Sequence, residues 1–201
     1  MGAFTRERSN VASGPGRAHP ERSMKLDRLP TWAKKHVVHV VVEAPRDSKL
    51  KLKYEPELGA ITWGHPLPIG FAYPYDWGFV PSTLAADGDP LDALVLSEVA
   101  SYPGVVIPCQ PFGVLELDQK QNGERTRNDR LVVLPMEGRW TNEVKKPQDM
   151  PRETIEELEH FFLSTVFFSH KRARCLGWKG PKAAIRLIES AAARASKKKA
   201  A

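Results

Sequence analysis

The sequence has 201 residues, of which 41% are hydrophobic and 27% charged; these values are typical of a soluble globular domain and exclude a disordered or fibrous chain. The formal net charge is +6, but the positive charge is concentrated at the ends: residues 1–30 carry +3, residues 170–201 carry +9, and the middle carries −6. A nucleic-acid partner is therefore not expected, and the basic segments 171–174 and 197–199 are interpreted as solvated faces.

Cysteine content and terminal composition bear on the compartment. Cys109 and Cys175 are too few for a disulfide framework and lack metal-binding spacing, which favours a reducing environment. No stretch approaches the roughly 20 apolar residues of a membrane span, and no signal-peptide core is found. We therefore expect a cytoplasmic protein without membrane contact. A flexible extension is predicted over residues 1–30, a single domain over 31–195 and a basic tail over 196–201.

Short apolar runs separated by Gly, Pro, Asp and Asn predict closely spaced β-strands. The first run, Val37–Val42, is β-branched and stops before Pro45, as a strand would. Six further runs follow, at residues 60–63, 77–80, 93–96, 105–107, 113–117 and 131–134. Residues 36–135 are therefore predicted to be all-β, with the strand spacing of a barrel or sandwich.

Two helices are predicted in the C-terminal part of the chain. Asp149 can cap the first, Pro151 fits its first turn, and apolar side chains recur at helical spacing from Ile155 to Thr165. The second begins after Gly180, with an apolar face formed by residues 184, 185, 187, 188 and 192. The expected fold class is mainly β with some α, a β-barrel flanked by two C-terminal helices.

An acidic cluster, Asp87-Gly88-Asp89-Pro90-Leu91-Asp92, leads directly into the apolar run 93–96. Three carboxylates within six residues repel one another, so a turn that gathers them favours binding of a cation. Oxygen ligands without His or Cys favour Mg²⁺, Mn²⁺ or Ca²⁺ over zinc. An EF-hand does not fit, because Leu91 falls where a ligand is needed and Asp92 where glycine is needed. The alternative is an acidic turn that only caps a strand.

Two more segments carry candidate site residues. Lys53 and Glu55 point to the same face if their segment is extended, and there they could contact phosphate and metal respectively. The alternative is a surface ion pair of little energetic value. Between residues 73 and 79, four aromatic side chains surround Asp76, and they could either line a pocket or form core.

In order and spacing, these motifs resemble those of the family I soluble inorganic pyrophosphatases. The resemblance covers residues 37–194, and its most specific element is the DGDPxD signature at 87–92. The other matching motifs are Glu43-Ala44-Pro45, Lys53-Tyr54-Glu55, Gly59-Ala60, Tyr73-Pro74, Gly78-Phe79, the stretch from Pro111 to Leu115, and Gly177-Trp178. The resemblance implies an OB-like closed β-barrel with flanking helices and a homo-oligomer, which for bacterial members of this size is a hexamer.

The resemblance also implies a reaction. It is the hydrolysis of pyrophosphate by a metal-activated water, with Mg²⁺ as the cofactor and Mn²⁺ as a substitute. Asp87 and Asp92 would hold the metal ions. Asp89 would accept the proton of the attacking water, and Tyr73 would support that part of the site.

Further roles are implied outside the acidic cluster. Glu43 and Glu55 would contact the metals directly or through water, and Lys53 would bind phosphate. Asp118 aligns with another metal-binding carboxylate only after a shift of one residue. Arg130 takes the position of a phosphate-binding lysine.

The sequence departs from the family where phosphate is held. His65 stands where the family has an arginine and Trp77 where it has a tyrosine; each can donate one hydrogen bond, but neither can form the fork of an arginine. Asn128 stands where the family has a carboxylate, unless Asp129 takes over its position. Thr165-Val166 replaces a Tyr-Lys pair, which removes two phosphate donors.

This pattern indicates an enzyme whose water-activating half is intact and whose substrate recognition is weakened or altered. Each lost charged hydrogen bond is worth about 1.5–3 kcal/mol, or roughly 10- to 150-fold in affinity. Three hypotheses follow: a magnesium-dependent inorganic diphosphatase, a hydrolase of another diphosphate, and a non-catalytic homologue that serves as a binding or assembly module. Nucleic-acid binding has the weakest support. The candidate substrate-binding residues are Lys53, His65, Trp77 and Arg130.

Overall fold

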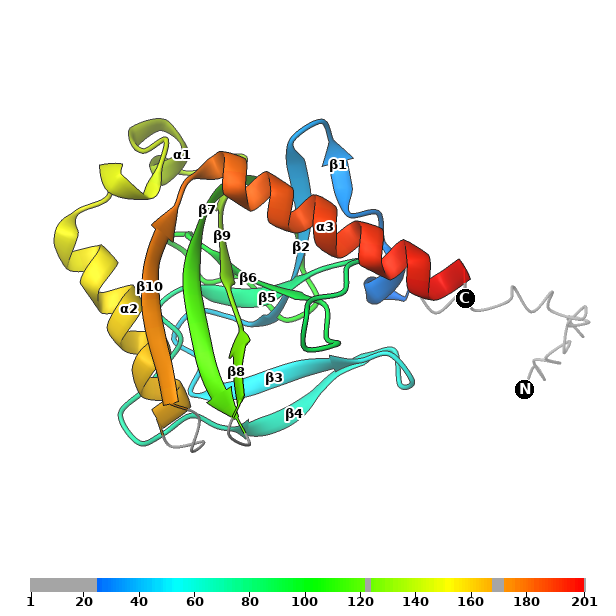
Figure 1. Cartoon of the computed structure of the whole chain (residues 1–201), viewed down its shortest axis with the longest axis horizontal. Coiled ribbons are helices and arrows are strands. Elements are labelled where there is room, and N and C mark those ends of the chain that lie inside the picture. The colour runs from blue at the N-terminus through cyan, green and yellow to red at the C-terminus, as the bar shows by residue number, and fades with distance from the viewer. Residues whose placement is uncertain (1–24, 122–123, 168–171, 201) are drawn as a thin grey trace, which may run out of the picture.

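The computed structural model describes residues 25–121, 124–167 and 172–200 (Figure 1). Its strands are β1 (Trp32–Lys34), β2 (Val37–Ala44), β3 (Leu50–Glu55), β4 (Ala60–Pro66), β5 (Asp76–Val80), β6 (Leu91–Val95), β7 (Val106–Gln121), β8 (Glu124–Arg127), β9 (Arg130–Pro135) and β10 (Arg172–Lys179). Its helices are α1 (Arg139–Glu143), α2 (Arg152–Phe167) and α3 (Pro181–Ala200), with short 3-10 helices η1 (Leu26–Arg28) and η2 (Pro147–Asp149). The predicted all-β stretch is confirmed, since the described residues between 36 and 135 contain β2 to β9 and no α-helix.

Five strands are joined in a hydrogen-bonded ring. β2 pairs with β5, β5 with β6, β6 with β9, β9 with β7, and β7 returns to β2. These pairings are antiparallel, except that β6 and β9 run parallel. The long strand β7 makes closure possible, because residues 106–109 pair with β2 while residues 109–115 pair with β9. The ring with its flanking helices confirms the predicted OB-like fold.

Helices α2 and α3 cover different faces of the ring strands. Leu94 and Val132 belong to the hydrophobic cluster that contains Phe162 of α2, whereas Val133 belongs to the cluster that contains Ile188 of α3. Neighbouring residues of a strand point to opposite faces, so both faces of these strands are buried. This explains why the strands show continuous apolar runs without alternation.

Both predicted C-terminal helices are present. α2 starts at Arg152, directly after Pro151, and α3 starts at Pro181. Strand β10, between them, was not predicted: its residues alternate between exposed and half-buried, and its arginines suggested a solvated segment. None of the helices in the described residues is long and apolar enough to cross a membrane.

The ends of the chain differ from the predicted boundaries. Residues 1–24 of the predicted extension lie outside the described part, but Leu26–Arg28 form η1. At the other end, α3 continues through Ala200, so the segment expected to be a basic tail is helical up to that residue. We retain the single domain as a prediction, with η1 and the whole of α3 added to it.

β3 and β4 form a separate two-stranded hairpin beside the ring (Figure 1). Tyr54 of this hairpin packs with Val41 of β2 and Phe79 of β5 in one small hydrophobic cluster. The Tyr54 and Phe79 rings are stacked, with centres 5.8 Å apart. This packing fixes the hairpin next to the start of β6, where the acidic cluster lies.

Candidate active site

The acidic cluster forms a tight loop that leads into β6. Gly88 has a φ of 92°, in the left-handed region that glycine tolerates best. The Asp89 N–H donates to Asp87 Oδ1 at 3.2 Å, and the Ala85 N–H donates to the Asp89 carbonyl oxygen at 2.7 Å. The third carboxylate, Asp92, is the second residue of β6. The turn therefore places Asp89 and Asp92 on one cavity, and Asp87 and Asp92 on a second.

Hydrogen bonds at its base hold this loop in place. Thr83, which is buried, donates from Oγ1 to the Val80 carbonyl oxygen at 2.6 Å and accepts a hydrogen bond of 2.9 Å from the Leu91 N–H. The Leu84 N–H donates to the Ala191 carbonyl oxygen of α3 at 3.0 Å. The loop is thus fixed both by the strands beside it and by the C-terminal helix.

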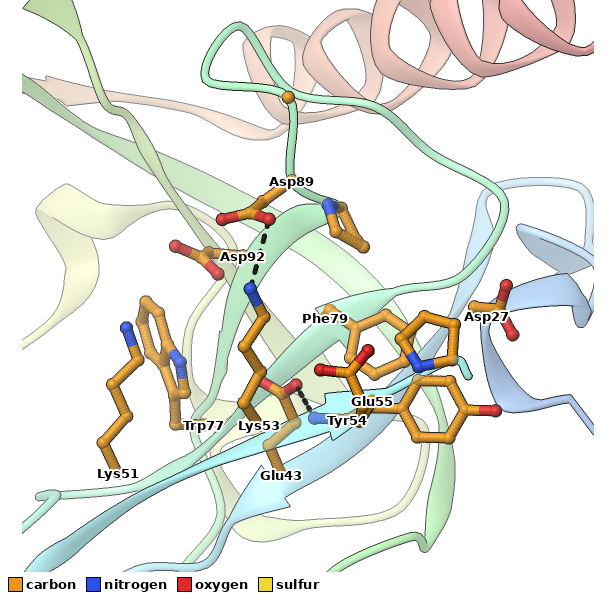
Figure 2. Close-up of a pocket in the computed structure, with 13 residues that line it drawn as sticks. Asp27, Glu43, Lys51, Lys53, Tyr54, Glu55, Trp77, Phe79, Asp89 and Asp92 are labelled. Atoms are coloured by element: carbon orange, nitrogen blue, oxygen red, sulfur yellow. Dashed lines mark hydrogen bonds and ion pairs between the residues drawn. The ribbon is translucent and has the colours of Figure 1, made fainter. Parts of the chain in front are cut away.

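A cavity of about 330 Å³ lies between the acidic loop and the β3–β4 hairpin (Figure 2). Lys53 of β3 reaches across it, and its Nζ lies 3.3 Å from Asp89 Oδ1. Lys53 and Glu55 both line the cavity, as alternation along an extended segment requires. The cavity brings together six of the predicted site residues: Glu43, Lys53, Glu55, Trp77, Asp89 and Asp92.

Glu43 is the most deeply placed carboxylate of this cavity. It lies on β2 with 7% of its surface exposed, and its Oε1 accepts a hydrogen bond of 2.6 Å from the Tyr54 N–H. Burial raises the pKa of Glu43 from 4.5 to about 7, and the negative charge of Asp92 contributes, although the Tyr54 N–H opposes the rise. A cation bound beside Glu43 would favour its ionised form, so its environment suits a metal contact.

Asp92 is paired with Arg130 of β9. Arg130 Nη1 donates to Asp92 Oδ2, and the guanidinium carbon lies 5.4 Å from the Trp77 ring centre and 5.8 Å from that of Phe162. Burial raises the pKa of Asp92, whereas the charge of Arg130 lowers it. Trp77 therefore has two functions: it lines the cavity, and it supports the cation that neutralises Asp92.

Tyr73 lies in the core behind these residues. It is 6% exposed, and its ring packs against Trp77 and Phe161 with ring centres 5.9 and 5.7 Å away. Burial raises the pKa of the Tyr73 hydroxyl well above its ordinary value, and the negative charges of Asp92 and Glu43 add to the rise. The hydroxyl is therefore neutral at working pH and can serve as a hydrogen-bond donor.

A second cavity, of about 170 Å³, adjoins the first and is also lined by Asp92. Asp87, Asn128 and Asp129 line it as well. The Asp129 carboxylate is engaged, because its Oδ1 accepts a hydrogen bond of 3.1 Å from the Leu117 N–H and its Oδ2 accepts one of 2.9 Å from Arg127 Nη2. Asp129 therefore lines the cavity beside Asn128, with both of its carboxylate oxygens already hydrogen-bonded.

Three predicted site residues line neither cavity: Tyr73, described above, His65 and Asp118. His65 is exposed on β4 and lines neither of them. Asp118 forms an ion pair with Arg125 of β8, and strand alternation turns it to the face of β7 opposite that of the buried Gln119. Of the Thr165-Val166 pair, Thr165 donates from Oγ1 to a carbonyl oxygen of its own helix, and the Val166 side chain lies outside the described part.

Comparison with known proteins identifies the family. A family model described as inorganic pyrophosphatase matches residues 40–196, a range that contains every acidic residue of the two cavities except Asp27. The chain belongs to the inorganic pyrophosphatase family. The resemblance inferred from the sequence motifs is thereby confirmed.

Individual members of the inorganic pyrophosphatase family are similar over most of their length. An inorganic pyrophosphatase of Thermus thermophilus is 36% identical over 173 residues, which cover 84% of this chain and 97% of the relative. One from Synechocystis is 33% identical over 166 residues, or 83% of this chain and 96% of the relative. The crystal structure of the Thermus thermophilus inorganic pyrophosphatase superposes with a TM-score of 0.79 at 35% identity, covering 86% of this chain and 99% of that one.

The site of this chain offers the type of ligand atom that binds a hard divalent cation. The acidic loop and Glu43 offer only carboxylate oxygens, the ligands that Mg²⁺ and Mn²⁺ prefer. In the part of the chain that the structure describes, no group of three or more His, Cys, Asp or Glu side chains is already arranged to hold a metal ion. Asp89 is instead paired with Lys53, and Asp92 with Arg130. A metal would therefore compete with these two cations for the same carboxylates.

The structure adds three residues that the motifs did not indicate. Lys51 lines the first cavity and lies two positions before Lys53, so strand alternation could have indicated it. Asp27 lines the same cavity from η1, ahead of the family match. Arg194 of α3 lines the second cavity, and nothing in the local sequence separates it from the other charged residues of this helix.

Proposed function

We propose that this protein is a cytoplasmic, Mg²⁺-dependent inorganic diphosphatase that hydrolyses pyrophosphate to two phosphates, with Mn²⁺ as a substitute metal. One observation carries the proposal: Lys53 and Asp89 meet across a cavity that also contains Glu43 and Asp92. A cation for phosphate and carboxylates for metal thus share one space. The relatives named inorganic pyrophosphatase support this function over the alternatives.

The water-activating half of the site is built on the acidic loop. Bound Mg²⁺ would neutralise the substrate and activate a water for direct attack on phosphorus. Asp87, Asp92 and Glu43 are proposed to hold it, assisted by Glu55. Asp89 is exposed at the cavity and accepts the proton of the attacking water. Since the acid-base work falls to a residue in contact with solvent, the proton can be returned to water after each turnover.

The substrate half of the site depends on fewer cations than the family pattern. Lys53 is proposed to bind phosphate, and so is Arg130, which Trp77 supports. Tyr73 is proposed to support the water-activating half instead, from the core behind Asp92, with its hydroxyl kept neutral by burial. His65 is not included, because it does not line the cavity.

Phosphate release tests the proposal. Purified protein is assayed with pyrophosphate, a nucleoside diphosphate and an isoprenoid diphosphate, each with Mg²⁺ and with Mn²⁺, and Asp89→Ala serves as the control. We expect release from pyrophosphate that the control loses. Activity confined to another diphosphate, or wild-type release no higher than that of the control on every substrate, would contradict the proposal.

The assembly is proposed to be a homo-oligomer, specifically a hexamer, in keeping with the family resemblance. Sedimentation velocity at micromolar protein concentration measures it directly. A single species with six times the mass of the chain is expected. A monomer under these conditions would contradict this part of the proposal.

A further inference from the structure

Lys51 lies on the cavity side of β3, two residues before Lys53. Side chains two positions apart on a strand share a face, and both lysines line the 330 Å³ cavity. Figure 2 shows Lys51 beside Trp77, with its ammonium directed to the same side of the hairpin as Asp92. The cavity therefore contains a second lysine next to the carboxylates that are proposed to hold the metal.

The β3–β4 hairpin has a β-bulge next to Lys51. In the β3–β4 register Lys51 is opposite His65 and Leu52 is opposite Trp63, so Gly64 is an extra residue in β4. A Cβ on Gly64 would lie 2.6 Å from the Lys51 carbonyl oxygen, so only glycine permits this approach. The bulge falls in β4, and the alternation of β3 that directs Lys51 into the cavity remains regular.

The charge of Lys51 acts on the same groups that shape the site. Lys51 lines the same cavity as Glu43 and Asp92, and its positive charge favours the ionised form of both carboxylates. Lys53, by contrast, is already paired with Asp89. In the described part of the chain, Lys51 forms no ion pair within 4 Å, so its ammonium can bind an anion without first breaking one.

We propose that Lys51 is a substrate-binding residue that contacts a phosphoryl group of pyrophosphate and compensates for the arginine that His65 replaces in the family pattern. The proposal rests on the proposed function, because it concerns the same substrate. It accounts for how an acidic cavity with few cations binds an anion: the β3–β4 hairpin provides two lysines from one strand face. A lysine is suited to this position, because its ammonium is a compact charge on a flexible stem.

Substitution by methionine tests the role, since it keeps the length of the side chain and removes its charge. The Lys51→Met variant is compared with Lys49→Met, a matched change at an exposed lysine two residues earlier. We expect Lys51→Met to raise the KM for magnesium pyrophosphate on the order of 10- to 100-fold, with a smaller change in kcat. Lys51→Arg should restore most of the affinity. Equal KM values for the two methionine variants would overturn the proposal.

The Mn²⁺ affinity of Lys51→Met distinguishes a substrate contact of Lys51 from a general structural role. Removing a positive charge beside Glu43 and Asp92 should leave Mn²⁺ affinity unchanged or increase it, as measured by calorimetry without substrate. A misfolded site would lose affinity for both Mn²⁺ and pyrophosphate, which would also overturn the proposal.

Direct binding keeps the inference independent of turnover. Pyrophosphate binding to Asp89→Ala and to the double variant Asp89→Ala/Lys51→Met is measured by calorimetry in the presence of Mg²⁺. Weaker binding of pyrophosphate to the double variant supports the role of Lys51, even if the wild type releases no phosphate. An absence of phosphate release would contradict only the proposed function. Equal binding overturns the role of Lys51.

Discussion

Arg194 Nε donates a hydrogen bond of 2.8 Å to the carbonyl oxygen of Leu84. This bond joins α3 to the residue from which the acidic loop departs, and Arg194 Nη1 is itself held by Ser190 Oγ at 2.8 Å. The C-terminal helix therefore helps to position the acidic loop at 87–92.

The first prediction concerns this link. Arg194→Ala should weaken Mn²⁺ binding about fivefold, because a hydrogen bond worth about 1 kcal/mol no longer restricts the loop. Calorimetric titration measures the effect, and Arg186→Ala, an exposed arginine of the same helix, is the control. If both variants bind Mn²⁺ like the wild type, the loop is held by its other bonds alone.

The second prediction concerns Arg130. Arg130→Met leaves Asp92 without its cation and should lower the free energy of unfolding by about 2 kcal/mol in EDTA; the cost is below that of a fully buried pair because the Asp92 side chain is 32% exposed. Arg130→Lys keeps the charge but loses the planar contact with Trp77. Its free energy of unfolding should therefore lie between those of the wild type and Arg130→Met. Urea titration gives these values. A methionine variant as stable as the wild type would show that Asp92 is protonated without Arg130.

The third prediction concerns pH and Glu43. The pKa of Glu43 is raised in the folded state from 4.5 to about 7, so the unfolded chain releases this proton first. The contribution to stability is complete below pH 4.5 and is lost as pH rises to 7, at a total cost of about 3 kcal/mol in metal-free protein.

Glu43→Gln removes this titration while its side-chain oxygen can still accept the Tyr54 N–H. The stability of the variant relative to the wild type, measured by urea titration in EDTA, should therefore increase between pH 4.5 and 7. A difference that stays constant over this range would contradict the assigned pKa.

The fourth prediction concerns Tyr73. Its hydroxyl remains neutral because burial raises its pKa, so Tyr73→Phe removes a hydrogen-bond donor and no ionisable group. We expect kcat/KM to fall about 10-fold, as for loss of one hydrogen bond near charged groups, with the alkaline limb of the pH–rate profile unchanged. A shift of that limb in the variant would mean that Tyr73 titrates during turnover.

Most of the fold could be predicted because its strands and helices have strong local patterns. The ring strands are continuous apolar runs, and α2 and α3 begin at proline signals. β10 was not predicted, because it pairs with β7 along one edge and its side chains are exposed or half-buried. Arg172 and Arg174 therefore interrupt its apolar residues, and the strand shows no continuous apolar run. Ring closure depends on which strands pair over long distances, and local patterns do not carry that information.

The candidate site divides in the same way. Asp87, Asp89 and Asp92 are close in sequence, so one turn brings them together and a motif is enough to find them. Lys51 and Arg194 enter the site through strand pairing and helix packing instead. Asp118 was expected in the site, but it aligns with the family's carboxylate only after a shift of one residue. Such a shift along a strand reverses the side-chain direction, and Asp118 pairs with Arg125 of β8 instead of lining a cavity.

The position of η1 determines how far the chain can be shortened. The Leu26 N–H donates to the Tyr54 hydroxyl at 3.2 Å, the Ser82 N–H donates to the Asp27 carbonyl oxygen at 2.9 Å, and Leu29 packs beside Tyr54. A chain that starts at residue 31, or at the family match near residue 40, would lose this support for the hairpin and the segment before the acidic loop. The smallest active unit should therefore start ahead of Leu26, so a removable purification tag should be cleaved before that residue.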